Sequence, residues 1–137
     1  MTLPLAKPAR AEGLVAGILN AAFAARGETA TAGVIVPTEV SWTAATKFVQ
    51  VLRMPATEVR YPILWRTPVQ FTAWAGTTTV AQDLAALAEA ILLAYPGSDL
   101  VAGFLPLSSG LLAKDPATGA QLASSAVSAK LQGIAFT

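Results

Sequence analysis

The chain has 137 residues, only 12% of them charged, and its nine basic and eight acidic residues leave a net charge of +1. The length predicts one domain over residues 1–137, and the weak charge excludes long-range attraction of nucleic acid, so we expect no specific nucleic-acid binding. The absence of cysteine and histidine excludes disulfides, His-ligated zinc and nucleophiles activated by an imidazole base.

The acidic residues are spread almost evenly between Glu12 and Asp115, and no local spacing pairs them for metal binding or acid–base catalysis. We therefore expect no catalytic residue, no metal site and no cofactor. The charged fraction is also about half of the roughly 25% that soluble domains typically carry. Too few charges remain to cover the surface of a lone subunit.

The apolar spacing from Ala9 to Arg26 predicts a first helix, which Gly27 would end. Lys7, Arg10 and the apolar run that follows also imitate a secretory signal peptide. Two polar residues, Glu12 beside the run and Asn20 within it, favour a folded helix instead. The run is too short for the ~20 residues of a membrane span, so no membrane partner is expected.

Three short strands are expected next, at Thr31–Val36, Thr46–Met54 and Glu58–Arg66. In the third, Val59, Tyr61, Ile63 and Trp65 alternate with polar neighbours, which is the pattern of a strand with one covered face. Pro62 interrupts it and removes a ladder donor. The segment is therefore predicted to be an edge strand or an extended arm.

Pro68 is expected to open a strand over Val69–Ala75, followed by a helix over Thr79–Tyr95 with Thr79 as its N-cap and Gln82 at the reciprocal position. Large apolar residues at helical spacing predict the stripe that faces the sheet: Val80, Leu84, Leu87, Ile91 and Tyr95. The alanines at 85, 86, 88 and 90 either permit close approach of another surface or reflect helix propensity alone.

A strand over Leu100–Leu107, a loop over Ala113–Ala120 and a long strand over Leu122–Phe136 complete the chain. The predicted fold is α+β, a mainly antiparallel sheet with two helices packed on one face.

Two stretches carry a resemblance to a known family. They are "RTPVQFTAWAGTTTVAQDLAALAEAIL" (Arg66–Leu92) and the ending "VAGFLPLSSGLLAKDPATGAQLASSAVSAKLQGIAFT" (Val101–Thr137). The first is a strand, a small-residue turn and an Ala/Leu helix, and the second is a strand, a Pro/Gly loop and a long final strand. In this order they resemble the tail terminator, or tail completion, proteins of long-tailed bacteriophages.

The resemblance implies a structural virion protein and not an enzyme. It would form a ring of identical subunits, typically a hexamer, at the head-proximal end of the tail. There it would stop tube polymerisation and contact the major tail tube protein and the head–tail connector proteins. The expected location is the virion tail, and the host cytoplasm during assembly.

Subunit contacts are expected at aromatic residues in loop or edge segments, since such residues are enriched at interface hot spots. The candidates are Arg60, Tyr61, Trp65 and Arg66 in the third strand, together with Trp42. For a lone tryptophan, covering the core is the competing interpretation.

Other classes stay open. Ser108, Ser109 and Gly110 could place a nucleophile on a turn, but the chain offers no histidine base. A different head–tail connector or stopper ring, or a small exported or ligand-binding domain, are the remaining alternatives.

Overall fold

The sheet is mixed, and the predicted α+β class is confirmed. The computed structural model describes residues 5–8, 10–37, 41–42, 46–61 and 64–135. Its elements in chain order are β1 Ala6–Pro8, α1 Ala11–Ala25, β2 Thr31–Gly33, β3 Lys47–Arg53, β4 Glu58–Arg60, β5 Leu64–Ala75, α2 Thr78–Leu93, β6 Val101–Lys114 and β7 Gln121–Ala135.

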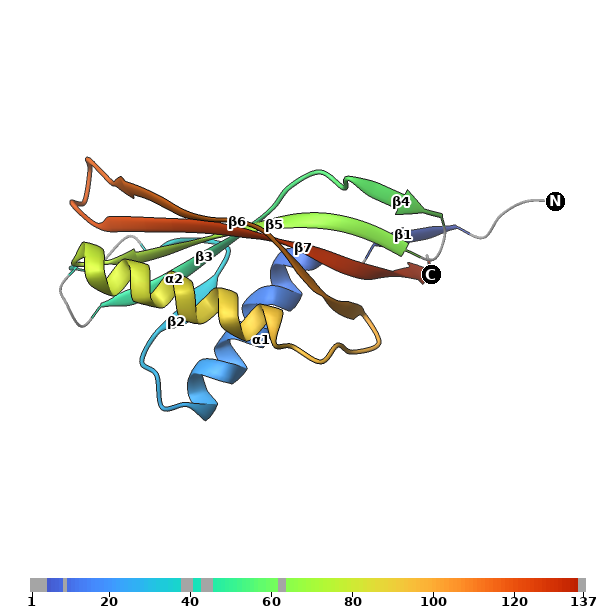
Figure 1. Ribbon diagram of the computed structural model, residues 1–137, viewed down its shortest axis with the longest axis horizontal. Coiled ribbons are helices and arrows are strands. Elements are labelled where there is room, and N and C mark those ends of the chain that lie inside the picture. Colours follow the sequence, from blue (N-terminus) through green and yellow to red (C-terminus); the bar gives the residue numbers. More distant parts are fainter. Residues whose placement is uncertain (1–4, 9, 38–40, 43–45, 62–63, 136–137) are drawn as a thin grey trace.

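The described residues form one sheet of seven strands. Neighbouring strands follow the order β1-β7-β5-β3-β2, and the two strands outside this order pair as β4 with β5 and β6 with β7. The described pairings are antiparallel except that of β2 with β3, which is parallel. A parallel pair requires a long connection between its strands, and residues 34–46 separate β2 from β3 in the sequence. Figure 1 shows both helices on the same side of the sheet.

The two faces of the sheet can be read along β5, because successive side chains of a strand point to opposite faces. Val69, Phe71 and Ala73 belong to the buried core beneath the helices. Gln70, Thr72 and Trp74 alternate with them and therefore lie on the opposite face, which we call the outer face. Neither helix covers the outer face (Figure 1).

Helix α1 ends as the sequence predicts. Gly27 adopts a left-handed conformation with φ of 70°. The Glu28 amide donates to the Phe23 carbonyl at 2.8 Å and the Gly27 amide to Ala24 at 3.2 Å, the two bonds of a Schellman cap. The helix begins at Ala11, because Arg10 is an extended N-cap residue, and Ala9 lies outside the described residues.

Asn20 protects the free edge of β2. Its Nδ2 donates to the Ala32 carbonyl at 2.9 Å, and the Ala32 amide donates to its Oδ1 at 2.8 Å. The side-chain amide thus takes the place of a neighbouring strand. Covering an edge in this way blocks pairing with another chain there.

An ion pair forms at the start of β3. Lys47 donates to the Glu28 carboxylate at 2.9 Å, and this contact lowers the pKa of that carboxyl.

The prediction of one strand over Glu58–Arg66 is wrong. The segment forms a hairpin in which β4 pairs antiparallel with the start of β5, placing Glu58 opposite Arg66 and Arg60 opposite Leu64. Period-two alternation continues through a tight reversal, so the pattern alone did not distinguish one strand from two. Pro62 and Ile63 lie outside the described residues.

Pro68 does not open β5 but lies inside it. Its carbonyl accepts from the Met54 amide at 2.9 Å, so its nitrogen faces the same side as β3 and β4. On that side the partner changes from β4, which ends its pairing at Arg66, to β3, which begins at Val69. The missing N–H therefore falls in a gap of the ladder, where it costs no hydrogen bond.

The N-cap of α2 is Thr77 rather than the predicted Thr79. Thr77 has extended φ and ψ, and its side-chain oxygen accepts from the Val80 amide at 3.3 Å. Three consecutive threonines offer equivalent capping chemistry, so the choice depends on where β5 ends, which is Ala75. With this cap, Gln82 is not at the reciprocal position of a capping box.

The face that α2 presents to the sheet is richer in alanine than predicted. Its buried residues are Ala81, Leu84, Ala85, Ala88 and Leu92. Val80, Leu87, Ile91 and Tyr95 are only partly buried at the flanks. Small side chains allow the helix axis to approach the sheet closely, so Ala85 and Ala88 serve internal packing, whereas Ala86 and Ala90 are exposed.

Strands β6 and β7 form a long hairpin, and β7 continues past the C-terminal end of α2 (Figure 1). β6 is longer than predicted and continues through Ser108 to Lys114, with register shifts between Pro106 and Ser108 and between Ser108 and Leu111. The predicted loop shrinks to a tight turn, in which the Thr118 amide donates to Asp115 at 3.0 Å. Strand β1, which pairs with the end of β7, was not predicted.

The capping assignment predicts different effects for neighbouring threonines. Thr77→Ala should lower the unfolding free energy by about 1 kcal/mol, because it removes the N-cap acceptor. Thr79→Ala, within the first turn, should change it by less than about 0.5 kcal/mol. Urea denaturation measures both, and equal losses would contradict the assignment.

Close packing of α2 predicts a second contrast. Ala88→Leu should destabilise the fold by about 1–3 kcal/mol, since Ala88 is completely buried against the sheet. Ala90→Leu, on the exposed side of the same helix, is the matched control and should change stability by less than about 0.5 kcal/mol. A tolerated Ala88→Leu would show that the helix does not lie close to the sheet.

Candidate subunit interface

Tyr61 and Trp65, two of the residues expected at subunit contacts, lie together but differ in exposure. Trp65 in β5 is 7% exposed and belongs to the core, while Tyr61 is 44% exposed. Their rings meet edge to face with centroids 6.0 Å apart. The Tyr61 hydroxyl accepts from the Ala6 amide at 3.0 Å, which ties β1 to the β4–β5 hairpin. Only Tyr61 of this pair presents substantial surface to a partner.

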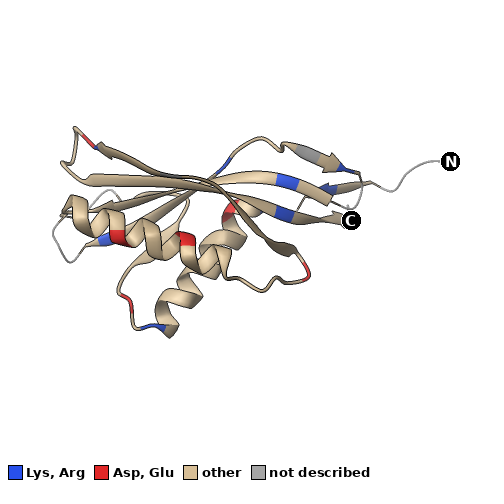
Figure 2. Ribbon diagram, in the orientation of Figure 1, with Lys and Arg blue, Asp and Glu red and all other residues tan. Residues whose placement is uncertain are grey.

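Arg60 and Arg66 lie at the same end of the sheet. Arg66 is opposite Glu58 in β4 and opposite Lys130 in β7. Arg60 is exposed at the end of β4. Figure 2 shows that Lys and Arg residues concentrate at this end, whereas the two acidic residues of α2 lie elsewhere. This end is a basic, partly aromatic surface.

Trp42 does not join this cluster. It is half-buried and its ring packs at a tilt on Trp74, with centroids 5.6 Å apart. Trp74 follows Trp65 by nine residues in β5, a span of about 30 Å in an extended strand. The five predicted contact residues therefore occupy two separate places.

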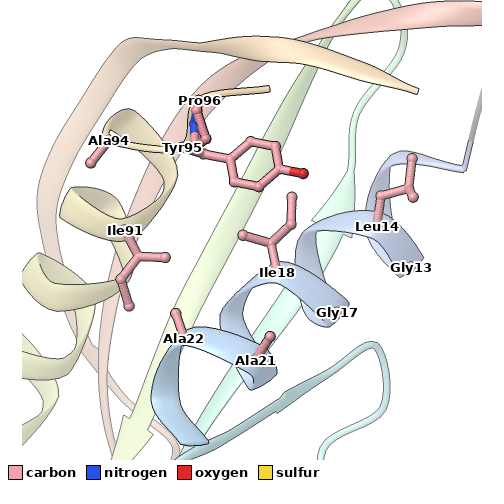
Figure 3. A pocket seen from close by; sticks show the side chains of 10 residues that line it. All are labelled: Gly13, Leu14, Gly17, Ile18, Ala21, Ala22, Ile91, Ala94, Tyr95 and Pro96. Carbon is pink, nitrogen blue, oxygen red and sulfur yellow. The ribbon is translucent and has the colours of Figure 1, made fainter. Parts of the chain in front are cut away.

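A large apolar concavity lies between the helices. It is an open groove of about 630 Å³ between α1 and the C-terminal end of α2, and its lining residues in the described chain include no charged side chain. Figure 3 shows Ile91 and Tyr95 on the α2 side facing Ile18 on α1. Along α1 the groove is lined by two neighbouring rows of residues: Leu14, Ile18 and Ala22, and a wall of small residues at four-residue spacing, Gly13, Gly17 and Ala21.

The glycines of this wall are not required by the internal packing. A Cβ atom built on Gly13 or Gly17 meets nothing within 4 Å. By contrast, a Cβ on Gly97 would lie 2.8 Å from the Ala102 carbonyl oxygen. A glycine inside a helix costs about 1 kcal/mol relative to alanine. In a chain otherwise rich in alanine, these two glycines leave the groove wall open at a cost in stability.

A second uncharged surface lies on the outer face. It is a trough of about 420 Å³ across the middle of the sheet, whose floor includes Gln70 and Ala126 and whose described lining residues carry no charge. Three large apolar side chains line it and remain 42%, 54% and 69% exposed: Met54, Leu107 and Leu111. We call these three residues the outer-face patch.

The outer-face patch depends on the irregular path of β6. Each register shift in β6 leaves an extra residue opposite β7, which bends the strand and redirects side chains. Gly110, with φ of 86°, lies in the shift between Ser108 and Leu111. Ser108 and Gly110 are thus part of a bulged edge strand, and not of the turn considered as a nucleophile site.

Both surfaces have a signal in the sequence that we did not use. The small residues of α1 recur every four positions, which defines one helix face. The leucines of β6 cluster around Pro106 and Gly110, a composition typical of an irregular strand rather than of a loop.

No known family model matches this chain, and a search of curated protein sequences gives no significant match either. Neither described helix has the length and hydropathy to cross a bilayer. Among the described residues, no three His, Cys, Asp or Glu side chains are placed to hold a metal ion.

Burial predicts opposite roles for the two aromatic residues. Trp65→Ala should lower the unfolding free energy by about 3–5 kcal/mol, because it empties a site in the core. Tyr61→Ala should lower it by only about 1 kcal/mol, because Tyr61 is largely exposed and its hydrogen bond to Ala6 and its edge-to-face contact with Trp65 are each modest. If Trp65→Ala instead left stability unchanged and altered only the oligomeric mass, Trp65 would be a contact residue, as the sequence suggested.

Proposed function

We propose that this protein is a structural ring protein of the tail terminator type, placed at the head-proximal end of a bacteriophage tail tube. Its subunits associate into a closed ring of typically six copies. The ring stops polymerisation of the major tail tube protein and provides the surface to which head–tail connector proteins bind. It acts in the virion tail and assembles in the host cytoplasm.

The observation that supports assembly into a ring is the pair of uncharged, apolar surfaces on opposite sides of one subunit. The groove lies among the helices, and the outer-face patch lies on the uncovered face of the sheet. Exposed apolar patches on soluble proteins commonly mark interaction sites. Two different patches that meet between copies form a heterologous interface, which closes into a ring when the rotation permits.

The tail assignment has different support. It comes from the resemblance of Arg66–Leu92 and Val101–Thr137 to tail terminator proteins, and from an α+β architecture with two helices against a mainly antiparallel sheet. A stopper or another connector ring is the nearest alternative. The absence of histidine and cysteine argues against a catalytic role that depends on either.

Electron microscopy tests the proposal directly. The purified protein, alone and mixed with tail tubes assembled from the major tail tube protein, should form rings and add density to one end of each tube. Tubes incubated without it should keep growing when more subunits are supplied, whereas capped tubes should stop. Rings that bind connectors but never tubes would indicate a stopper instead, and absence of both rings and capped tubes would refute the proposal.

A further inference from the structure

We infer that the outer-face patch of one copy docks into the groove between α1 and α2 of the next copy. This inference rests on the proposed ring and names the two surfaces that form it. Leu107 and Leu111 would lie against the wall formed by Gly13, Gly17 and Ala21.

The chemistry of the two surfaces matches. Neither the described lining of the groove nor that of the trough contains a charged side chain, so the contact buries no unpaired charge. At 69% exposure the Leu111 side chain projects into solvent, which suits entry into a concave partner. The apolar core of a permanent interface has this composition.

The groove glycines give the second argument. Internal packing leaves open space where their side chains would be, although alanine would favour the helix. A close approach from outside the subunit accounts for the absence of side chains at both positions. Small residues along a helix allow a neighbouring surface to come near its backbone.

The position of the surfaces favours a head-to-tail contact over a symmetric one. If two grooves met, the outer-face patch of each copy would remain in water, and two meeting patches would leave the grooves exposed. A single heterologous contact covers both surfaces in every copy of a closed ring. A small apolar ligand fits less well, because ligand sites enclose most of the ligand surface and this groove is open.

Disulfide cross-linking tests the contact without interference from native thiols, because the chain contains no cysteine. Ala21→Cys places a thiol in the groove and Leu111→Cys places one in the patch. Under mild oxidation, a mixture of the two single variants should give a disulfide-linked dimer. The double variant should give a ladder that ends at the ring size.

Ile35→Cys is the matched control, since Ile35 is 83% exposed and lies outside both surfaces. It should cross-link with neither partner above background. Cross-linking of Ala21→Cys with itself would indicate a symmetric groove contact and overturn the inference. Equal yields for the Leu111 and Ile35 variants would overturn it as well.

A substitution in the groove gives an independent readout. Gly17→Leu introduces a good helix former into open space, so the subunit should fold at least as stably as the wild type by urea denaturation. It should nevertheless weaken association at least tenfold by light scattering, as should Leu111→Ser. Ile35→Ser should leave association unchanged, and a Gly17→Leu variant that still forms rings would contradict the inference.

These outcomes separate the inference from the proposed function. Rings that cap tubes but show no groove-to-patch cross-link would remove the inference and leave the tail role intact. Cross-linked rings that never bind tubes would keep the contact and remove the tail role. A single chain carrying a bound small molecule in native mass spectrometry, at every concentration, would overturn the contact.

Discussion

The two helices cover one face of this sheet, and the trough across the middle of the other face has no charged side chain among its described lining residues. Across its middle lie Gln70, Thr72, Ser124 and Ala126, with exposed leucine and methionine side chains at their margins. The charged residues Arg66 and Lys130 of this face lie toward the β4 end, where Lys and Arg residues concentrate (Figure 2). A chain with 12% charged residues cannot place charges everywhere, and it leaves both the trough of the outer face and the helix groove without them. The proposed assembly is a consequence of this distribution.

The alanine content of α2 links the internal packing to the groove. Because Ala81, Ala85 and Ala88 face the sheet, the helix lies close to it, and the larger side chains are displaced to the flanks. Ile91 is one of these, and it forms a wall of the groove opposite α1 (Figure 3). The small residues that tighten the core therefore also leave apolar surface outside it. Asn20 restricts which surfaces can associate. Because its side chain closes the free edge of β2, copies must associate through other surfaces.

The sequence predicts elements well where one local signal decides them, and poorly where the outcome depends on distant pairing. The end of α1 followed from Gly27 alone, and the long final strand from its alternation. The position of Pro68 inside β5 depends on a change of partner strand at that residue, which no local pattern contains. The same holds for the candidate site. Tyr61 was recognised as an aromatic in an edge segment, but the burial of Trp65 and the separation of Trp42 depend on the hairpin and on Trp74. The groove required the relative placement of two helices.

The central claim is that a lone subunit leaves too much uncharged apolar surface in water to persist. The most direct measurement is the mass of the purified protein by analytical ultracentrifugation from micromolar to millimolar concentration. The account predicts one defined multiple of 14.1 kDa that does not increase once it has formed. A constant mass of 14.1 kDa over the whole range would contradict it.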